Sequence, residues 1–263
     1  MQVKRLPKNG YSLWYYTQGS PANPALVFLH PAFGDHTCFH HQVEAFAAAY
    51  HVIALDLLGH GRSQVQSGNT TVEATADLLT EILPAEGHAW AHLVGVSLGS
   101  LIAQYLASRF PDMTKTITVV GGYSIFGDHS VITRAQRGEM FKWLFLALVS
   151  MDRFRRYVAS STNVVEAERE AFYRAAQGFT RRSFRVMPGM QKVLDKADRT
   201  LPQPLLILVG EHDLPVIRRH AQAWHARLPQ AELHIVPAAG HCANMDNPQA
   251  FNRVLSRFLE MHR

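Results

Sequence analysis

The stretch "AHLVGVSLGSLIAQYLASRFPD", from Ala91 to Asp112, decides the fold of this 263-residue chain. Its first part is a run of apolar or small residues typical of a buried strand, and its second part has the spacing of an amphipathic helix. Ser97 stands between the two, with Gly95 and Gly99 two positions away on either side. A strand that turns directly into a helix holds the residue between them in a strained conformation, with its side chain above the sheet.

The two glycines fit such a turn. Neighbouring backbone comes very close there, and Gly95 and Gly99 lack the side chains that would collide with it. The helix that we expect from Leu98 also directs free N–H groups at any negative charge beside Ser97. As an alternative, Ser97 simply caps that helix, a common role for serine. This alternative leaves both glycines unexplained.

The rest of the chain alternates short apolar runs with helical patterns. This rhythm predicts an α/β fold with a mostly parallel sheet and helices on both of its faces. Asn9-Gly10 suits the tight turn of an antiparallel hairpin at the start of the chain. We expect buried strands at residues 25–30, 51–57, 91–97, 115–122, 204–213 and 231–240. We expect helices at residues 39–49, 72–83, 98–110, 217–228 and 248–261.

The rhythm is interrupted once, between Tyr123 and Pro202, where the sequence is amphipathic and rich in arginine. We interpret this segment as a helical insertion over the sheet, so that residues 1–122 and 203–263 form the core and 123–202 a cap. Between Tyr123 and Thr200 there are 14 Lys and Arg against 8 Asp and Glu. The excess of positive charge in this segment is larger than the net charge of the whole chain, which is +5. This excess indicates either a solvated helical face or a substrate that carries a carboxylate or phosphate.

Composition excludes several classes of protein. The N-terminal segment has no apolar stretch followed by a cleavage site, and no later run reaches about 18 apolar residues, so we expect a soluble, cytoplasmic protein without membrane insertion. Cys38 and Cys242 are too few for a disulfide framework. The basic segments lack the aromatic residues and modules of nucleic-acid binding. The expected partner is a small-molecule substrate, and the oligomeric state stays open.

Functional side chains of an open parallel sheet gather beyond the carboxyl ends of its strands. Three residues at these ends, Ser97, Asp213 and His241, supply a nucleophile, an acid and a base in that chain order. A neutral serine needs a base that titrates near pH 7, and histidine is the usual one. The residues at all the expected strand ends are His30, Asp56, Ser97, Gly122, Asp213 and His241.

The acid has alternatives. Glu211 lies nearer to the strand interior, and Asp128 follows the preceding strand. Asp213 could also serve only to cap the helix that starts near Pro215.

Five blocks of sequence, "LVFLHPAFGD", "DLLGHGRS", "GVSLGS", "LVGEHD" and "GHCANMDNP", together resemble the α/β-hydrolase fold superfamily. The resemblance covers nearly the whole chain and is to the serine hydrolase branch of esterases and lactonases. It implies a Ser–His–Asp triad on an eight-stranded sheet, with a cap between strands six and seven. Ser97 would be the nucleophile, His241 the general base and acid, and Asp213 the group that orients the imidazole. Serine at this position argues against the epoxide hydrolase and haloalkane dehalogenase branches, which use aspartate.

The resemblance also implies an oxyanion hole made of two N–H groups. Leu98, the residue after the nucleophile, should supply one, and the loop after His30 the other. Here the chain has His30-Pro31 where the family commonly has His-Gly, and proline has no N–H. Ala32 is the first candidate for the second donor, and Phe33 is the second.

Other residues receive simpler interpretations. A turn anchored by hydrogen bonds is expected at Asp56, Gly59, Gly61, Arg62 and Ser63. Cys38 and Cys242 are expected near the site without a catalytic role. His40-His41 is an adjacent pair without a third ligand, so no metal is expected. No phosphate-binding loop is present, and no cofactor is expected. Aromatic side chains are the candidate substrate contacts, although we expect most of those in the cap to pack onto the sheet instead. They are Phe33, Tyr123, Phe126, Phe141 and Trp143, and the further cap aromatics Phe145, Phe172 and Tyr173.

Together these features predict hydrolysis of a carboxylic ester, thioester or lactone of a small to medium, partly apolar substrate through an acyl-enzyme. Two alternatives remain: carbon–carbon bond hydrolysis or a lyase reaction with the same triad, and a ligand receptor with little turnover.

Overall fold

The computed structural model describes residues 1–263, with every side chain except that of Gln136. Eight strands form one sheet in the order β1-β2-β4-β3-β5-β6-β7-β8. β1 pairs antiparallel with β2, β2 pairs antiparallel with β4, and all other neighbours are parallel. The predicted fold class and N-terminal hairpin are therefore confirmed. The strands are β1 (Gln2–Lys8), β2 (Tyr11–Gln18), β3 (Ala25–Leu29), β4 (His51–Leu55), β5 (Ala91–Val96), β6 (Thr114–Val120), β7 (Leu205–Gly210) and β8 (Glu232–Val236).

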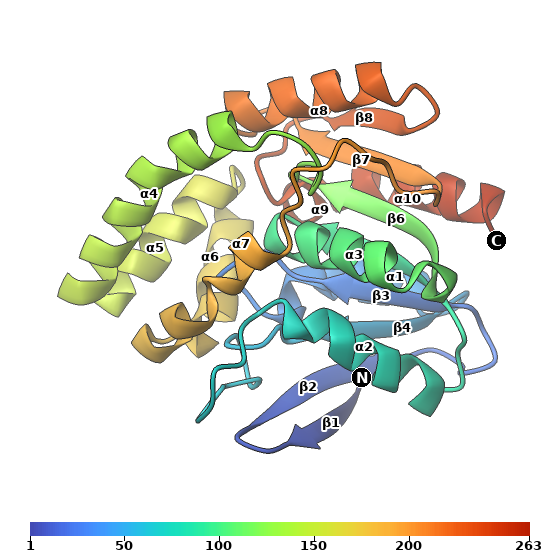
Figure 1. The fold of residues 1–263 in the computed structure, drawn as a ribbon, viewed down its shortest axis with the longest axis horizontal. Coiled ribbons are helices and arrows are strands. Elements are labelled where there is room, and N and C mark those ends of the chain that lie inside the picture. Colours follow the sequence, from blue (N-terminus) through green and yellow to red (C-terminus); the bar gives the residue numbers. More distant parts are fainter.

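Helices cover both faces of the sheet, and each face has its own apolar core (Figure 1). One core takes side chains from α2 (Ala74–Ala85), α3 (Leu98–Arg109) and α8 (Pro215–Arg227). The other takes them from α1 (His40–Phe46) and α10 (Pro248–Met261). The helix expected at 39–49 is shorter than predicted, because a 3-10 turn, η1 (His36–Phe39), takes its first residue and residues 47–49 form a turn after Phe46. Two short elements, η2 (Pro111–Met113) and α9 (Ala243–Asp246), were not expected.

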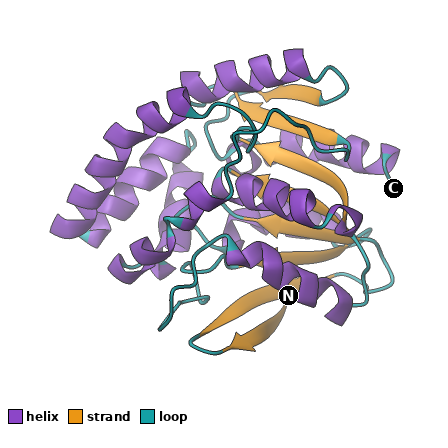
Figure 2. Ribbon diagram, in the orientation of Figure 1, coloured by secondary structure: helices purple, strands orange, loops and turns teal.

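The segment between β6 and β7 folds into helices, as its sequence predicts, and contains no strand of the sheet. Figures 1 and 2 place these helices beyond the carboxyl ends of the parallel strands. None of the described helices combines the length and apolar character needed to cross a membrane. The inserted elements are α4 (Ser130–Val149), α5 (Met151–Thr162), α6 (Glu166–Ala175), η3 (Ala176–Gly178), η4 (Arg181–Val186) and α7 (Gly189–Lys192).

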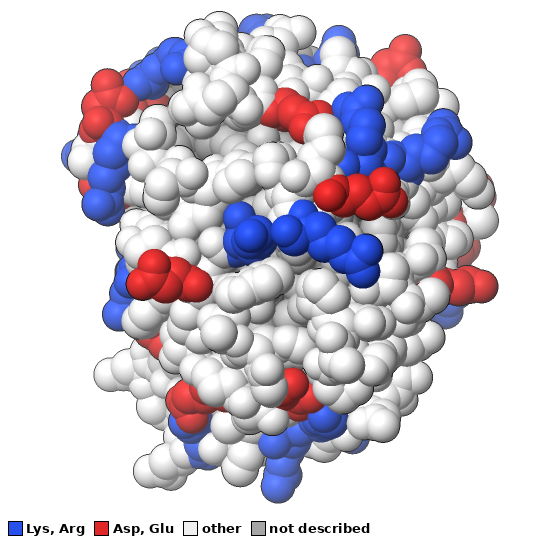
Figure 3. Space-filling view, turned by 90° about the vertical axis from the view of Figure 1, so that its right-hand side faces the viewer, with Lys and Arg blue, Asp and Glu red and all other residues white. Residues whose placement is uncertain are grey.

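Arginines hold the inserted helices to one another. Arg155 donates hydrogen bonds to the carbonyls of Ala176, Gln177 and Phe179. Arg181 likewise donates to the backbone carbonyls of Ala147 and Leu148. Arg169 donates to the carbonyl of Asn163. Much of the basic excess of this segment is thus used within the fold. Figure 3 shows the side of the molecule away from these helices, where Lys and Arg form a short band with Asp and Glu beside it.

Asp56 anchors the turn that follows β4. Its buried carboxylate accepts hydrogen bonds from the His36 N–H (3.1 Å) and Nδ1 (2.7 Å), the Arg62 N–H (2.8 Å) and the Tyr16 hydroxyl (3.1 Å). Gly61 has φ +47°, and a Cβ there would lie 2.7 Å from the Asp56 Oδ1. The predicted role of this segment as an anchored turn is confirmed.

We expect Asp56→Ala to lower the free energy of unfolding by about 3 kcal/mol, because it leaves buried donors without an acceptor. Urea unfolding measures this loss. Asp128→Ala is the control, since Asp128 is exposed and its carboxylate accepts hydrogen bonds, among the residues described, only from Ser130. The loss of stability in this variant should stay below about 1 kcal/mol. Equal losses in the two variants would contradict the anchoring role of Asp56.

Candidate active site

Ser97 occupies a sharp strand-to-helix turn between β5 and α3. Its φ is +50° and its ψ is −114°, a region that residues other than glycine rarely adopt. Its N–H donates to the carbonyl of Val120 (2.8 Å), which ties the turn to the neighbouring strand β6. The Ser97 side chain makes no capping hydrogen bond to α3. The predicted turn geometry is confirmed, and the interpretation of Ser97 as a helix cap is wrong.

The two flanking glycines permit this turn by their lack of side chains. A Cβ on Gly95 would overlap the backbone of Gly99 and Ser100. A Cβ on Gly99 would overlap the carbonyl oxygen of Leu29 and lie 2.5 Å from its carbonyl carbon. Helix α3 can therefore begin directly above β3 and β5 only with glycine at both positions.

Asp213, which is buried, and His241, which is partly exposed, form a pair beyond β7 and β8. The His241 Nδ1 donates to the Asp213 Oδ1 at 2.8 Å, and the same oxygen accepts from the Leu214 N–H at 2.7 Å. Asp213 is 3% exposed. The hydrogen bond fixes the proton of a neutral His241 on Nδ1 and leaves Nε2 free to accept one. The structure therefore brings together the acid and the base that the sequence pairs.

The other acids have different partners. Asp128 accepts from the N–H and the hydroxyl of Ser130 at the start of α4. Glu211 is exposed and accepts from the Ala238 N–H at 2.9 Å. Helix α8 begins without a side-chain cap, so the interpretation of Asp213 as its cap is wrong.

The charge of Asp213 raises the basicity of His241. Burial favours the neutral ring, but the negative charge of Asp213 and its hydrogen bond outweigh this, so the pKa of His241 is raised above its ordinary 6.5. The Asp213 Oδ2 is buried and has no donor among the described residues. The carboxylate therefore offers its charge chiefly to the imidazole, which favours a protonated His241.

Gly121 is a residue of the site that sequence reasoning missed. It follows β6, has φ +56° and donates its N–H to the carbonyl of Leu208 (2.9 Å). A Cβ at this position would lie 2.9 Å from the His241 Nδ1 and 3.1 Å from the Asp213 Oδ2. Glycine here leaves room for the Asp213–His241 pair, and only the Gly121-Gly122 dipeptide at a strand end hinted at it.

Asp246 is a second missed residue, and it holds the loop that carries His241. Its carboxylate accepts from the Gly240 N–H (2.8 Å) and from the N–H groups of Val164 and Val165 in the inserted segment (3.0–3.1 Å). One buried carboxylate thus joins the histidine loop to the connection between α5 and α6. Asp246 is part of the block "GHCANMDNP", but nothing in that block indicates a partner in another segment.

The His30-Pro31 step is held by the imidazole of His30. Its Nδ1 donates to the carbonyl of Pro31 (2.7 Å), and its Nε2 accepts from the Leu57 N–H (2.9 Å). Burial lowers the pKa of His30 to about 4, so the ring is neutral. Within the described chain, the N–H groups of Leu98, Ala32 and Phe33 have no hydrogen-bond acceptor. Leu98 is therefore available as the first predicted oxyanion donor, and Ala32 and Phe33 both stay candidates for the second.

Similarity to known proteins identifies the family of this chain. The profile described as "Alpha/beta hydrolase family" matches residues 26–254. The chain belongs to this family. A Mycobacterium tuberculosis protein described as uncharacterized is 28% identical over 96% of this chain and 79% of its own length. The sn-1-specific diacylglycerol lipase ABHD11 of Mus musculus is 27% identical, over 92% of this chain and 82% of its own length. The solved structure of a thermophilic esterase from Thermogutta terrifontis superposes with a TM-score of 0.80 at 21% identity, and the match covers 100% of each chain.

In this α/β hydrolase, Phe33 joins the loop after β3 to the inserted helices. Its ring packs edge-on against Trp143, Phe154 and Phe179, with ring centres 5.0–5.1 Å apart. Phe33 also has a positive φ of 74°, so the backbone beside Ala32 is strained. Phe33 and Trp143 are the two predicted substrate contacts that the structure brings together.

The other predicted contacts lie elsewhere. The Phe126 ring packs beneath the guanidinium of Arg199, 4.8 Å from its centre. The Tyr123 ring lies beside those of His129 and His220. Phe141, on α4, is 69% exposed. For Phe126 and Tyr123 the structure thus gives packing partners, and for Phe141 it gives a position on the surface.

Both cysteines of this α/β hydrolase are buried free thiols. Burial raises the pKa of Cys38 and of Cys242 above the ordinary value, so neither is a thiolate near pH 7. This agrees with the expectation that neither thiol acts as a nucleophile.

Proposed function

We propose that this α/β hydrolase cleaves a carboxylic ester, thioester or lactone with Ser97 as nucleophile, His241 as base and Asp213 as the group that orients the base. The observation that carries the proposal is the strained turn at Ser97, together with the hydrogen-bonded Asp213–His241 pair on the same edge of the sheet. The name of the mouse relative, a diacylglycerol lipase, supports ester hydrolysis.

The reaction has two halves. The Ser97 Oγ attacks the carbonyl carbon while its proton passes to the His241 Nε2, and the N–H groups of Leu98 and Ala32 bind the oxyanion. His241 then protonates the leaving group and an acyl-serine remains. In the second half, water attacks the acyl carbon, gives its proton to His241, and Ser97 recovers that proton as the acid leaves. Asp213 stabilises each imidazolium electrostatically without taking the proton.

The aromatic group around Phe33 favours a partly apolar substrate, since it packs at the loop that holds Ala32. Trp143 adds one polar atom to this group. Its Nε1 is buried and has no acceptor in the described part of the chain. We propose that this N–H donates to an oxygen of the bound substrate, which would offset the cost of burying it.

A substrate panel tests the proposed reaction. It contains p-nitrophenyl esters of rising chain length, an acyl lactone, and a meta-cleavage diketone as the carbon–carbon alternative. We expect turnover of esters, with the best chain length set by the aromatic group. Turnover of the diketone without turnover of any ester would overturn the proposal in favour of carbon–carbon cleavage, and binding without turnover would favour a receptor.

Asp213→Asn gives a prediction for the pH profile. Because Asp213 raises the pKa of His241, removal of its charge should lower that pKa. The base works in its neutral form, so the acid limb of kcat/KM should move to lower pH in the variant. The rate should also fall by about 10⁴-fold, since the imidazole loses its orienting charge.

The pH profile of kcat/KM for an activated ester measures both effects. Asp128→Asn is the control and should keep the acid limb of the wild type, because Asp128 is hydrogen-bonded to Ser130 and not to His241. An acid limb that stays in place in Asp213→Asn would contradict the assignment of Asp213.

A further inference from the structure

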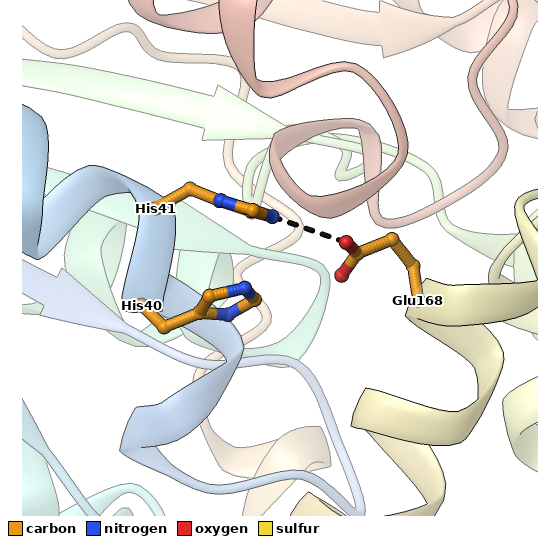
Figure 4. Close-up of side chains that lie close together, drawn as sticks. All are labelled: His40, His41 and Glu168. Atoms are coloured by element: carbon orange, nitrogen blue, oxygen red, sulfur yellow. Dashed lines mark hydrogen bonds and ion pairs between the residues drawn. The ribbon is translucent and has the colours of Figure 1, made fainter.

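The structure places a carboxylate, a third residue of a metal-ligating type, next to two histidines at the start of α1. Sequence reasoning found His40 and His41 unsupported. Glu168 of α6 lies against them, 127 residues along the chain from His41, and the His41 Nε2 donates to the Glu168 Oε1 at 3.0 Å. One ligand atom from each of the three residues lies within 4.8 Å of the others. Figure 4 shows both imidazoles projecting from α1 toward the carboxylate.

The hydrogen bonds around this cluster resemble those around metal ligands. The His40 Nδ1 donates to the carbonyl of Thr37 at 3.1 Å, which places the proton on Nδ1 and leaves Nε2 as an electron-pair donor. A backbone carbonyl that orients a ligating histidine in this way is the usual support of a metal site. The position of the His40 ring is therefore already suited to coordination through Nε2.

Glu168 provides an independent observation. Its Oε2 is buried, and no donor among the described residues reaches it. A carboxylate oxygen removed from water without a donor is costly, and a bound cation would compensate it. The hydrogen bond from His41 thus satisfies only one of the two oxygens.

We propose that His40, His41 and Glu168 bind a divalent ion of the zinc type. Two imidazole nitrogens and one carboxylate oxygen suit Zn²⁺, and three protein ligands leave a fourth position for water. Bonds of about 2.0–2.2 Å to a tetrahedral ion put ligand atoms roughly 3.3 Å apart, close to the 3.0 Å that already separates His41 from Glu168. On binding, the proton of the neutral His41 moves from Nε2 to Nδ1, and Nε2 gives its electron pair to the ion.

A second cluster of residues of metal-ligating types lacks the free ligand atoms of the first. It consists of Asp35, His36 and Asp56. Asp56 already accepts from His36, Arg62 and Tyr16. The His36 ring is also stacked on that of Tyr16, 3.4 Å between centres. Asp35 accepts from the Thr37 N–H at 2.9 Å. Each residue of this cluster is therefore already engaged by hydrogen bonds or stacking within the protein.

An ion at His40, His41 and Glu168 would fasten the inserted segment to the core. α1 belongs to the core, and α6 lies in the insertion. A Cβ on Gly34, in the loop after β3, would lie 3.7 Å from the ring of Phe172 on α6. The ion would thus restrain α6 against the segment that follows Ala32, and we expect it to raise the melting temperature.

Zinc titration of untagged, chelator-treated protein tests the proposal. Isothermal titration calorimetry should give one Zn²⁺ per wild-type chain, with the melting temperature rising as zinc is added. Co²⁺ in place of Zn²⁺ should give the visible absorption of a low-coordinate nitrogen and oxygen site. Both Glu168→Gln and His40→Ala should bind Zn²⁺ at least about 10-fold more weakly. The His40 side chain is exposed and, within the described part of the chain, is hydrogen-bonded only to Thr37, so its loss should leave the fold intact.

His234→Ala is the matched control. The His234 Nε2 lies 3.1 Å from the Glu232 Oε2, and the His234 side chain is about as exposed as that of His41. His234 belongs to no three-ligand cluster among the described residues. This variant should bind zinc as the wild type does. The same binding should persist in Ser97→Ala, so the metal proposal and the proposed hydrolysis can fail separately. No binding at micromolar zinc, or equal binding by wild type, Glu168→Gln and His40→Ala, would overturn the site.

Discussion

Ser97→Ala is expected to lower kcat/KM for an ester substrate by at least about 10⁴-fold, the largest effect of any single substitution in this site. The variant removes the oxygen that forms the acyl bond, while the Asp213–His241 pair and the oxyanion donors remain. The fold should not change, because the Ser97 side chain makes no hydrogen bond that holds the turn. Kinetics with p-nitrophenyl butyrate, together with a thermal melt, measure both quantities.

Ser108→Ala is the matched control for that experiment. Ser108 lies on the same helix, α3, and among the described side chains it is hydrogen-bonded only to Arg199, at 3.5 Å. It should keep wild-type activity. A Ser97→Ala variant that retained more than about 1% of the wild-type rate would exclude Ser97 as the nucleophile.

Gly99→Ala is expected to abolish stable folding, with a loss of more than about 4 kcal/mol. The added Cβ would overlap the carbonyl oxygen of Leu29 and lie 2.8 Å from that of His30. Both obstacles are backbone atoms at the end of a fully buried strand, so relief requires that α3 move away from the sheet. Urea unfolding, or the yield of folded protein where the variant is too unstable to purify, measures the effect.

Gly138→Ala provides the opposite result in the same chain. Gly138 lies within α4, and a Cβ there would meet nothing within 4 Å. Alanine should raise stability by about 0.5–1 kcal/mol, since it lowers the flexibility of the unfolded chain. Similar losses in the two variants would show that the close approach of α3 to β3 is not what requires glycine.

The elements that sequence predicted best are those whose signal is local. The apolar run that leads into Ser97, with glycine on both sides, predicts a sharp strand-to-helix turn, and the structure has this turn. Pro248 and Asn247 mark the start of α10 equally well: the Asn247 side chain accepts from the Ala250 N–H (3.1 Å), and the predicted range 248–261 is the observed one. Buried strands were found because apolar runs are continuous where both faces of a sheet are covered.

The contacts that sequence missed join segments that are distant along the chain. This is the case for Gly121, Asp246 and Glu168. Each contacts a residue in another element, and the sequence around it does not indicate which residue that is. Aromatic side chains were hard to assign for a related reason. Composition cannot distinguish Phe33, packed beside the site, from Phe141 on the surface, because both are apolar residues outside the strands.

Covalent labelling with a fluorophosphonate tests the central claim, that Ser97 is the nucleophile, most directly. The reagent should add once to the active protein, and fragment spectra of the tryptic peptide 63–109 should place the adduct on Ser97. Ser97→Ala should take up no reagent. An adduct on another residue, or an active protein that the reagent neither labels nor inhibits, would contradict the account.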